Sequence, residues 1–404
     1  MRSEKTKFLQ HYIQILKKAV KDLRDHLSGL YLKLNRSVKI YSKQSLYENK
    51  IVELNDRKIL SEFLIIRILG NDHYPIHSKD QTLNNLKFIL QNEPDFKNCR
   101  KCFVLNRIID KKREQELINL LKRYSIDYLR IPFSAKEYAG TGWKVDEFEG
   151  VDYFSSKKFY KKSLDIKKRQ LIWAMSPKIN YAMNLNGARN FALEEGKRTA
   201  NWTFVLDGNC IFKKRDFETL CYDCTHPPHL PYIIIPFARL SENIEYMKRG
   251  FIPEAIYEPQ IGFHFTAKEV FNPLFPYGII SKAELLKILG VPGKWTHWGG
   301  YSWQKSSSRA TKDKYLFKTS GGMVMRLSSG NYNREIKESA QSRFQDRLDA
   351  MANTIQYLTG TYGTKNKKFY EIIFSENNME FFMCKSSKDV IESDKPQTSD
   401  NKVN

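Results

Sequence analysis

The chain has 404 residues, with 67 basic and 45 acidic side chains and a formal net charge of +22. Its hydrophobic share of 41% can bury a substantial core, which excludes a wholly disordered chain. No apolar run is long enough to cross a bilayer, the first residues lack the apolar core of a signal peptide, and six cysteines are too few for a disulfide scaffold. We therefore expect a folded cytoplasmic protein with an anionic partner: nucleic acid, an acidic membrane surface or a phosphorylated small molecule.

The first 34 residues carry apolar side chains at alternating spacings of four and three, which predicts a heptad helix. These are Leu9, Ile13, Leu16, Val20, Leu23, Leu27, Leu30 and Leu34. Residues 1–50 also hold twelve Lys or Arg against four Asp or Glu. The pattern suits a coiled coil that joins subunits, a helix packed on the core, or a helix lying on a membrane surface. We favour self-association into a homo-oligomer.

From residue 58 short apolar runs alternate with amphipathic segments, which predicts a β-α-β-α-β series. The expected strands are 60–69, 102–109 and 127–132, and the expected helices are 81–90 and 111–124. Such a series predicts an α/β fold with a mainly parallel, Rossmann-like sheet flanked by helices.

Residues 134–170 interrupt this alternation, and we expect an insertion or loop there that lies over a site. Its last part, Lys157–Arg169, holds seven Lys or Arg and one Asp. The alternation then resumes, with expected helices at 184–195 and 336–360 and expected strands at 202–206, 232–236 and 259–265. The chain becomes polar from Lys385 on, which predicts a disordered tail.

The strongest local feature is a helix followed by a strand that ends in Asp207-Gly208-Asn209. The strand would bring a carboxylate and a carboxamide to the C-terminal edge of the sheet, where open α/β folds bind ligands. Gly208 would let the backbone approach a ligand closely. Asp207 and Asn209 offer hard oxygen donors for Mg²⁺ or Mn²⁺ that already carries phosphate. The alternative is an ordinary strand-ending turn, because all three are turn residues.

This order of elements resembles GT-A glycosyltransferases, especially the family-2-like enzymes, over about residues 60–265. Those enzymes have a Gly-x-Ala-Arg-Asn helix and then a strand that ends in an Asp-x-Asp metal motif. Residues 187–190 match the helix motif, and Asp207-Gly208-Asn209 takes the metal position with Asn209 in place of the second Asp. The resemblance implies a GT-A-like fold, a nucleotide-sugar donor, Mn²⁺ or Mg²⁺, and sugar transfer to a glycan or glycolipid acceptor in cell-surface polysaccharide or lipopolysaccharide synthesis.

The resemblance also implies which residues bind the donor. In such enzymes the end of the first strand and an Asp closing the second hold the base and the ribose. Basic side chains near the metal would stabilise the diphosphate leaving group. The candidates are Asn71, Asp72 and Asp110 for the nucleoside, and Arg67, Arg107, Arg189, Asn190 and the Lys157–Arg169 run around the diphosphate. As alternatives, Asp72 would only cap a turn and Arg189 would be a surface charge.

An inverting transfer needs a base within hydrogen-bond reach of the acceptor hydroxyl. Glu258 is our first candidate for this base and Asp313 the second, while Asp207 would act through the metal. His264 or His297 would complete the metal shell, although a histidine between two phenylalanines is more often an ordinary core residue.

A Gly- and Trp-rich segment, 291–303, carries Trp295, Trp298, Tyr301 and Trp303. Aromatic faces among glycines suit the acceptor sugar, or else form a small cluster that pins a loop. We accordingly divide the chain into an N-terminal helix (1–50), a nucleotide-sugar-binding domain (58–265), an acceptor-side region with a C-terminal helix (266–375) and a disordered tail (385–404).

Two CxxC pairs, Cys99/Cys102 and Cys221/Cys224, are followed by His226 and His229. They would allow a structural zinc site, but more than a hundred residues separate the pairs, and reduced thiols are the default.

Two other functions are weighed against the glycosyltransferase. A sugar nucleotidyltransferase would normally open with a Gly-rich phosphate loop, whereas residues 67–75 contain a single Gly. A non-enzymatic coiled-coil scaffold or nucleic-acid-binding protein would use the net charge, yet no helix-turn-helix, RRM or zinc-finger pattern is present. We expect the glycosyltransferase, without a nucleic-acid partner, and with the inner face of the membrane as an additional peripheral location.

Overall fold

The computed structural model describes residues 57–73, 76–226, 230–275, 277, 282–293, 313–328, 340–379 and 382, with only the backbone for 340–344. All of them belong to one compact unit, Asn55–Asn404. The predicted heptad helix at 1–50, the aromatic side chains at 295–303 with His297, and the polar tail from 385 lie outside the described residues.

The centre of this unit is a nine-stranded sheet with the order β3-β2-β1-β4-β7-β6-β9-β5, in which β8 also pairs with β6. The strands are β1 (Ser61–Leu69), β2 (Cys99–Asn106), β3 (Asp127–Ile131), β4 (Ala200–Asp207), β5 (Cys210–Ile211), β6 (Tyr232–Arg239), β7 (Tyr257–His264), β8 (Phe317–Thr319) and β9 (Val324–Arg326). The first four in this order are parallel, and β7 runs antiparallel to both β4 and β6. The 3-2-1-4 order is the beginning of the 3-2-1-4-5-6 order of a doubly wound fold. The predicted α/β class with a mainly parallel, Rossmann-like sheet is therefore confirmed.

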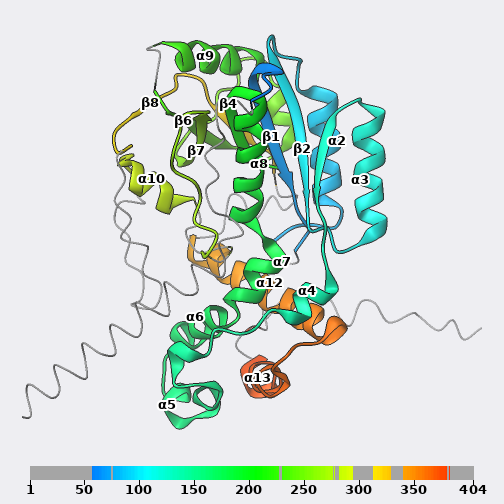
Figure 1. Cartoon of the computed structure of the whole chain (residues 1–404), viewed down its shortest axis with the longest axis vertical. Coiled ribbons are helices and arrows are strands. Elements are labelled where there is room, and N and C mark those ends of the chain that lie inside the picture. Colours follow the sequence, from blue (N-terminus) through cyan, green and yellow to red (C-terminus); the bar gives the residue numbers. More distant parts are fainter. Residues whose placement is uncertain are drawn as a thin grey trace, which may run out of the picture. The chain divides into compact units, whose positions relative to one another are not determined.

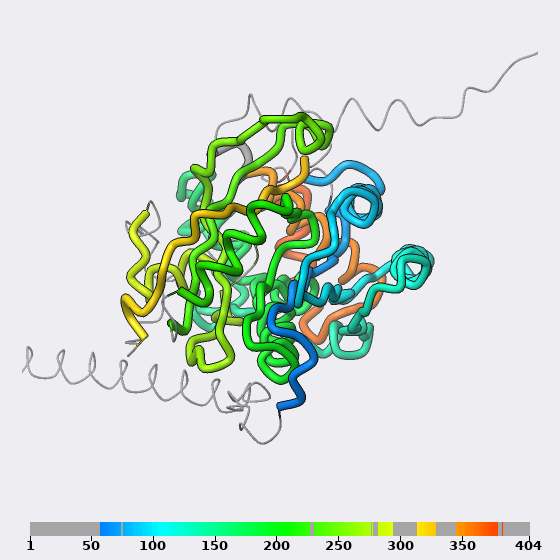
Figure 2. The backbone as a smooth tube through the Cα atoms, turned by 90° about the horizontal axis from the view of Figure 1, so that it is seen from above, coloured from blue at the N-terminus to red at the C-terminus, as the bar shows by residue number. Residues whose placement is uncertain are grey.

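Helices cover both faces of the sheet (Figures 1 and 2). Alternate side chains of β1 belong to the cores on these two faces. Leu64, Ile66 and Ile68 join a core with α8 (Leu185–Thr199) and α10 (Ala283–Leu289). Leu69 joins a core with α2 (Gln81–Asn92) and α3 (Lys111–Arg123), and Phe63 and Ile65 join one with α9 (Lys214–Thr225). Because both faces are covered, β1 is apolar over almost its whole length, as expected for a buried parallel strand.

The remaining helices form a second group, which we call the helical lobe and which is drawn below the sheet in Figure 1. Its members are α4 (Ala135–Gly140), η3 (Asp146–Phe148), η4 (Val151–Ser155), α5 (Lys157–Tyr160), α6 (Leu164–Ala174), α7 (Ser176–Met183), α12 (Ala340–Tyr362), α13 (Lys367–Ile373) and α14 (Glu376–Met379). An aromatic and aliphatic core joins residues 138–183 to residues 348–382. Neither α12 nor any other described helix is long and apolar enough to cross a membrane.

The structure corrects the prediction of an insertion or loop at 134–170. These residues form short helices, and three of their aromatic side chains, Tyr138, Phe154 and Phe159, are fully buried. The partners that bury them, such as Phe369, come from the other end of the sequence, 5.2 Å from Phe154 between ring centroids. A local pattern of short apolar runs cannot reveal such a distant partner.

The other predicted elements are confirmed, with small shifts at their ends. The strand expected at 102–109 runs from Cys99 to Asn106. It ends there because Arg107 adopts a left-handed backbone conformation with a φ of 48°, which a strand cannot continue through.

Candidate functional site

A pocket of about 280 Å³ lies where β1, β2 and β4 end, at the C-terminal edge of the parallel strands. Ligands of open α/β sheets bind at this edge. The lining residues come from strand ends, from α2, α7, α8 and α12, and from the loops between them. They are Ile68, Leu69, Gly70, Asn71, His73, His77, Gln81, Thr82, Asn85, Asn106, Ala182, Met183, Leu185, Arg189, Asp207, Gly208, Asn209, Phe237, Arg239, Glu258, Tyr277, Lys282, Arg326 and Arg347.

Asp207 and Arg189 form an ion pair in this pocket. Asp207 ends β4, and its side chain is 36% exposed. The Arg189 guanidinium, on α8, donates to Asp207 Oδ1 at 2.9 Å and to Asn186 Oδ1 at 3.0 Å. Burial would raise the pKa of Asp207, but the charges of Arg189, Lys282 and Arg326 and the hydrogen bond from Arg189 lower it to about 2. Asp207 is therefore a carboxylate at any physiological pH, held in place by a nearly buried arginine.

Gly208 is required by packing against the neighbouring strand. A Cβ atom at this position would lie 2.5 Å from the carbonyl oxygen of Ile68 and 2.9 Å from a methyl group of Leu69. The absence of a side chain thus lets the turn after β4 lie directly on the end of β1. This close approach keeps Asp207 beside the end of β1 at the edge of the pocket.

The pocket carries an excess of positive charge. Among the residues that the structure describes, five cationic side chains line it, against the two carboxylates of Asp207 and Glu258. The cations are Arg189, Arg239, Lys282, Arg326 and Arg347. Burial lowers the pKa of Lys282, although the nearby Glu258 and Asp207 act in the opposite direction. Such a concentration of cations in a concave, partly desolvated site attracts anionic ligands.

The donor set around Asp207 fits a divalent cation that arrives together with phosphate. Asp207 supplies one carboxylate, Asn209 follows two residues later, and Glu258 lines the same pocket. Within the described ranges no three His, Cys, Asp or Glu side chains are grouped so that they could hold a metal ion. Mg²⁺ is commonly bound by one or two carboxylates plus substrate phosphates. The Mn²⁺ or Mg²⁺ expected from the sequence stays a prediction, with Asp207 as its anionic ligand.

The two candidates that follow β1 take up different positions. Asn71 lines the pocket, and its side chain accepts from Ile109 N and donates to the Arg107 carbonyl, both at 2.9 Å. It therefore ties the loop after β1 to the loop after β2. Asp72 accepts from both the backbone N and the hydroxyl of Thr82, so it holds the first turn of α2 and is not among the lining residues.

Three further candidates make contacts that shape the site from outside the pocket. The Arg107 guanidinium donates to the carbonyl of Tyr181 and lies 3.8 Å from the centre of its ring. Asp110 caps α3 by accepting from the backbone N of residues 112 and 113. Asn190 exchanges two hydrogen bonds with the backbone of Phe271. None of the three lines the pocket.

Two groups of basic residues that we expected near the diphosphate lie elsewhere. Arg67 is fully buried under the sheet, where it pairs with Glu93 and donates to the Cys210 carbonyl at 2.7 Å. The Lys157–Arg169 run forms α5 and α6 of the helical lobe, and none of its residues lines the pocket. Both expectations are wrong, because sequence proximity to the motif does not bring these side chains to the strand ends.

His264 and Asp313 lie at the opposite edge of the sheet from Asp207. His264 pairs with Trp202, five residues before Asp207 on β4, which corresponds to about 16 Å along a strand. Asp313 accepts a hydrogen bond from the hydroxyl of Tyr232, which begins β6 at that same edge. His264 therefore cannot share a metal ion with Asp207, and Asp313 cannot act as a base in this pocket. The antiparallel direction of β7, which the sequence did not reveal, is the reason for the first error.

The cysteines of the two CxxC pairs do not converge on one point. Cys224 packs in the core beneath α9, with Cys99 and Cys221 against it, whereas Cys102 belongs to the core on the other face. Successive residues of a strand point to opposite faces, so Cys99 and Cys102 cannot turn toward a common ion. The described thiols are free, and the zinc alternative is not supported.

Four cationic residues of the pocket were missed in the sequence. Arg239 and Arg326 end β6 and β9, and the rule that singled out Asp207 at a strand end would have identified Arg239 as well. Lys282 precedes α10 and Arg347 lies within α12, where no motif marks them. They reach the pocket only through the tertiary fold.

The buried position of His73 leads us to expect that the free energy of unfolding depends on pH. It is buried in the pocket wall, with Nδ1 3.2 Å from Thr354 Oγ1, and burial lowers its pKa from the usual 6.5 to about 4. Below pH 6.5 the unfolded chain therefore binds a proton that the folded chain does not take up until about pH 4. We expect the free energy of unfolding to fall over this interval by up to about 3 kcal/mol more in the wild type than in His73→Gln. Urea unfolding of both proteins between these pH values checks the difference, and parallel curves would contradict it.

No protein-family model matches the chain, and no curated protein does either. Among solved structures, S. aureus TarS is 9% identical with a TM-score of 0.30 over 81% of this chain and 46% of TarS. The chain thus spans about half the length of that TarS structure. The shorter "TarS 1-349" structure is 8% identical, with a TM-score of 0.30 over 80% of this chain and 89% of that one. The 4-diphosphocytidyl-2C-methyl-D-erythritolsynthase from Anaerococcus prevotii DSM 20548 is 12% identical, with a TM-score of 0.23 over 76% of this chain and 99% of the synthase. Likenesses with such low scores carry no argument about this chain.

Proposed function

We propose that the chain is a glycosyltransferase that moves a sugar from a nucleotide-sugar donor to a glycan or glycolipid acceptor. The observation that supports this function is the pocket at the C-terminal edge of the sheet, where one buttressed carboxylate, Asp207, is surrounded by five cationic side chains. The negative charge of a nucleoside diphosphate would balance the excess positive charge of the pocket. The C-terminal ends of parallel strands are also the usual place for a nucleotide.

The chemistry requires stabilisation of the diphosphate that leaves when the sugar–phosphate bond breaks. Lys282 and Arg326 are our candidates for stabilising the leaving diphosphate, because both lower the pKa of Asp207 by their charge and both line the same pocket. A Mg²⁺ or Mn²⁺ bound by Asp207, with Asn209 beside it, would add Lewis-acid neutralisation of the same charge. Arg189 keeps Asp207 oriented toward the pocket. Preorganised charges of this kind are usually the largest contribution to catalysis.

Glu258 is the base candidate that the pocket supports. It lies at the start of β7, lines the pocket, and its Oε1 atom has no hydrogen-bond partner within the part of the chain that the structure describes. The closest cation, Lys282 Nζ, is 4.0 Å from Oε1. Because 41% of the Glu258 side chain is exposed, its carboxylate could take the proton of an acceptor hydroxyl in the pocket as the hydroxyl attacks the sugar.

A thermal-shift screen of UDP-, GDP-, CMP- and dTDP-sugars, with and without Mn²⁺, tests this function. A ligand at about 100 times its Kd adds roughly 2.7 kcal/mol of stability, which for a chain of this size raises Tm by about 3 °C. We expect one nucleotide class to give such a shift and Arg326→Gln to reduce the affinity by about tenfold, since it removes a charge-assisted contact. Lys122→Gln, on the exposed outer face of α3, is the matched control and should leave the shift unchanged. Absence of a shift with every donor, or release of pyrophosphate instead of a nucleoside diphosphate, would refute the proposal.

A further inference from the structure

The basic run at 157–162 has no role in the pocket, and the structure places it at the far end of the helical lobe. Figure 1 shows α5 and α13 at the end of this lobe that lies away from the sheet. Lys157, Lys158, Lys161 and Lys162 are all exposed. They occupy α5 and the turn that follows it, so that four ammonium groups lie within six residues.

Two apolar side chains are exposed among these lysines. Tyr160 is 38% exposed and Leu164 is 53% exposed. Leu164 begins α6, directly after the lysine-rich turn. Exposed apolar groups next to cations are typical of surfaces that lie at the interface of an anionic bilayer, where apolar groups enter the acyl boundary and cations meet headgroups.

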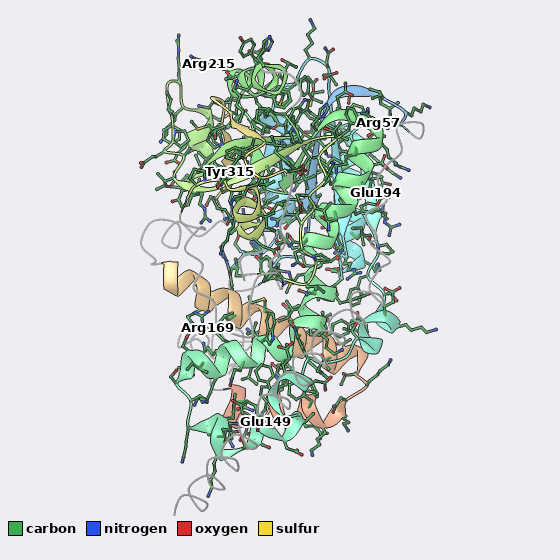
Figure 3. All side chains as sticks on the ribbon, turned by 60° about the vertical axis from the view of Figure 1, so that its left-hand side comes forward. Arg57, Glu149, Arg169, Glu194, Arg215 and Tyr315 are labelled. Atoms are coloured by element: carbon green, nitrogen blue, oxygen red, sulfur yellow. The ribbon has the colours of Figure 1, made fainter. Side chains whose placement is uncertain are left out.

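Residues 157–162 are fixed to the rest of the helical lobe by core packing and ion pairs. Phe159, between the lysines, is fully buried and packs 5.5 Å from Phe154 between ring centroids. Lys158 pairs with Glu149, which Figure 3 labels at this end of the lobe, so one of the four charges is already compensated. The neighbouring α13 is tied to η4 by the ion pair between Lys368 and Asp152. The lysines and Leu164 are thus presented on a formed scaffold.

Three of these charges lack an acidic partner. Within the described residues, no ion pair involves Lys157, Lys161 or Lys162, whereas Lys144, Lys158 and Lys168 of the same lobe each have one. We propose that the lysine face, defined as Lys157, Lys158, Tyr160, Lys161, Lys162 and Leu164, docks on an anionic phospholipid bilayer. Leu164 favours lipid over nucleic acid, because a phosphate backbone offers no apolar phase in which an aliphatic side chain could be buried.

This inference does not depend on the proposed sugar transfer, since no residue of the lysine face lines the pocket. It also assigns membrane contact to the lobe and not to the heptad segment at 1–50, for which the sequence analysis gave it as one of three alternatives. The two sources of membrane affinity can therefore be separated by substitution in the full chain.

The test is cosedimentation of the full chain with phosphatidylcholine vesicles, with and without phosphatidylserine. Each lysine near an anionic surface contributes about 1 kcal/mol, or about a fivefold change in partitioning. We expect the triple variant Lys157→Glu, Lys161→Glu, Lys162→Glu to lose at least about 100-fold in partitioning to phosphatidylserine vesicles. Leu164→Ser, which leaves the charge unchanged, should reduce partitioning by about fivefold.

The matched control reverses three exposed charges on α3, at the flank of the sheet: Lys112→Glu, Lys122→Glu and Arg123→Glu. This control has the same net charge as the lobe variant and should keep most of the vesicle binding. Circular dichroism and thermal melting establish that both variants are folded. Vesicle binding that survives in the lobe variant, or falls equally in both variants, would overturn the proposal. Binding of an oligonucleotide that the lobe variant loses, in the absence of any vesicle binding, would overturn it in favour of nucleic acid.

Discussion

Asp207→Asn is expected to lower the rate of sugar transfer by about a thousandfold at saturating donor. The substitution keeps the shape of the side chain but removes the single carboxylate at the end of β4 that faces the pocket with 36% of its surface exposed. Without it, a divalent cation loses its anionic protein ligand and Arg189 loses its partner, so both sides of the diphosphate site change. Loss of charge stabilisation of this kind costs on the order of 4 kcal/mol in the transition state, which corresponds to the stated factor.

The measurement is nucleoside diphosphate release with the donor identified in the thermal-shift screen, carried out over a series of Mn²⁺ concentrations. Asp127→Asn serves as the control, because Asp127 is an exposed carboxylate at the start of β3, at the opposite edge of the sheet. The control should turn over like the wild type. If Asp207→Asn folds, binds donor and keeps the wild-type rate, Asp207 is a structural partner of Arg189 and the proposed site is wrong.

Arg67→Met is expected to lower the free energy of unfolding by about 3–5 kcal/mol. Arg67 and Glu93 are both buried, with side-chain exposures of 0% and 1%. Of the cations that the structure describes around Glu93, the substitution would leave only Lys101, whose Nζ lies 3.5 Å from Oε2. Removing one member of a buried pair is costly because the other charge stays desolvated.

This pair also fixes the turn after β4. Arg67 Nε donates to the Cys210 carbonyl at 2.7 Å, and Glu93 Oε1 accepts from the backbone N of Phe212 at 2.9 Å. The double variant Arg67→Met, Glu93→Met removes both charges, and we expect it to recover a large part of the lost stability. Urea unfolding measures all three proteins. Lys367→Met provides the control, because its ion pair with Glu371 is exposed on both sides (84% and 62%) and contributes less than about 1 kcal/mol. A cost for Arg67→Met as small as that of Lys367→Met would contradict the assignment.

The sheet was predictable from the sequence because its strands can be recognised from their apolar composition. Buried parallel strands such as 61–69 and 200–207 are made mostly of apolar residues, and the amphipathic helices between them have a clear period. The direction of β7 was not predictable, because an antiparallel strand with both faces covered has the same apolar appearance as a parallel one. Because the direction of β7 was unknown, His264 was predicted at the wrong edge of the sheet.

Pocket residues could be predicted from the sequence where they lie at the end of a predicted strand or next to it. Asp207 and Asn71 follow strands that the apolar pattern already located, and both line the pocket. Glu258, chosen for its place just before the strand at 259–265, lies there as well. Lys282 and Arg347 could not be found, because a loop and a long helix bring them in from regions with no periodic or motif signal. Electrostatic partners of this kind are defined only in three dimensions.

The helical lobe is built from two distant segments of the chain, and this affects how the chain folds during synthesis. Its core joins residues 138–183 to residues 348–382, so the first half must wait for about 170 further residues before its aromatic side chains can be covered. Contacts of such large sequence separation form slowly, and uncovered aromatic surface is prone to aggregate. The pocket wall contributed by Arg347 is likewise completed only when α12 has emerged. A nascent chain that stalled before this helix would therefore hold a finished sheet edge, with Asp207 in place, but no closed site.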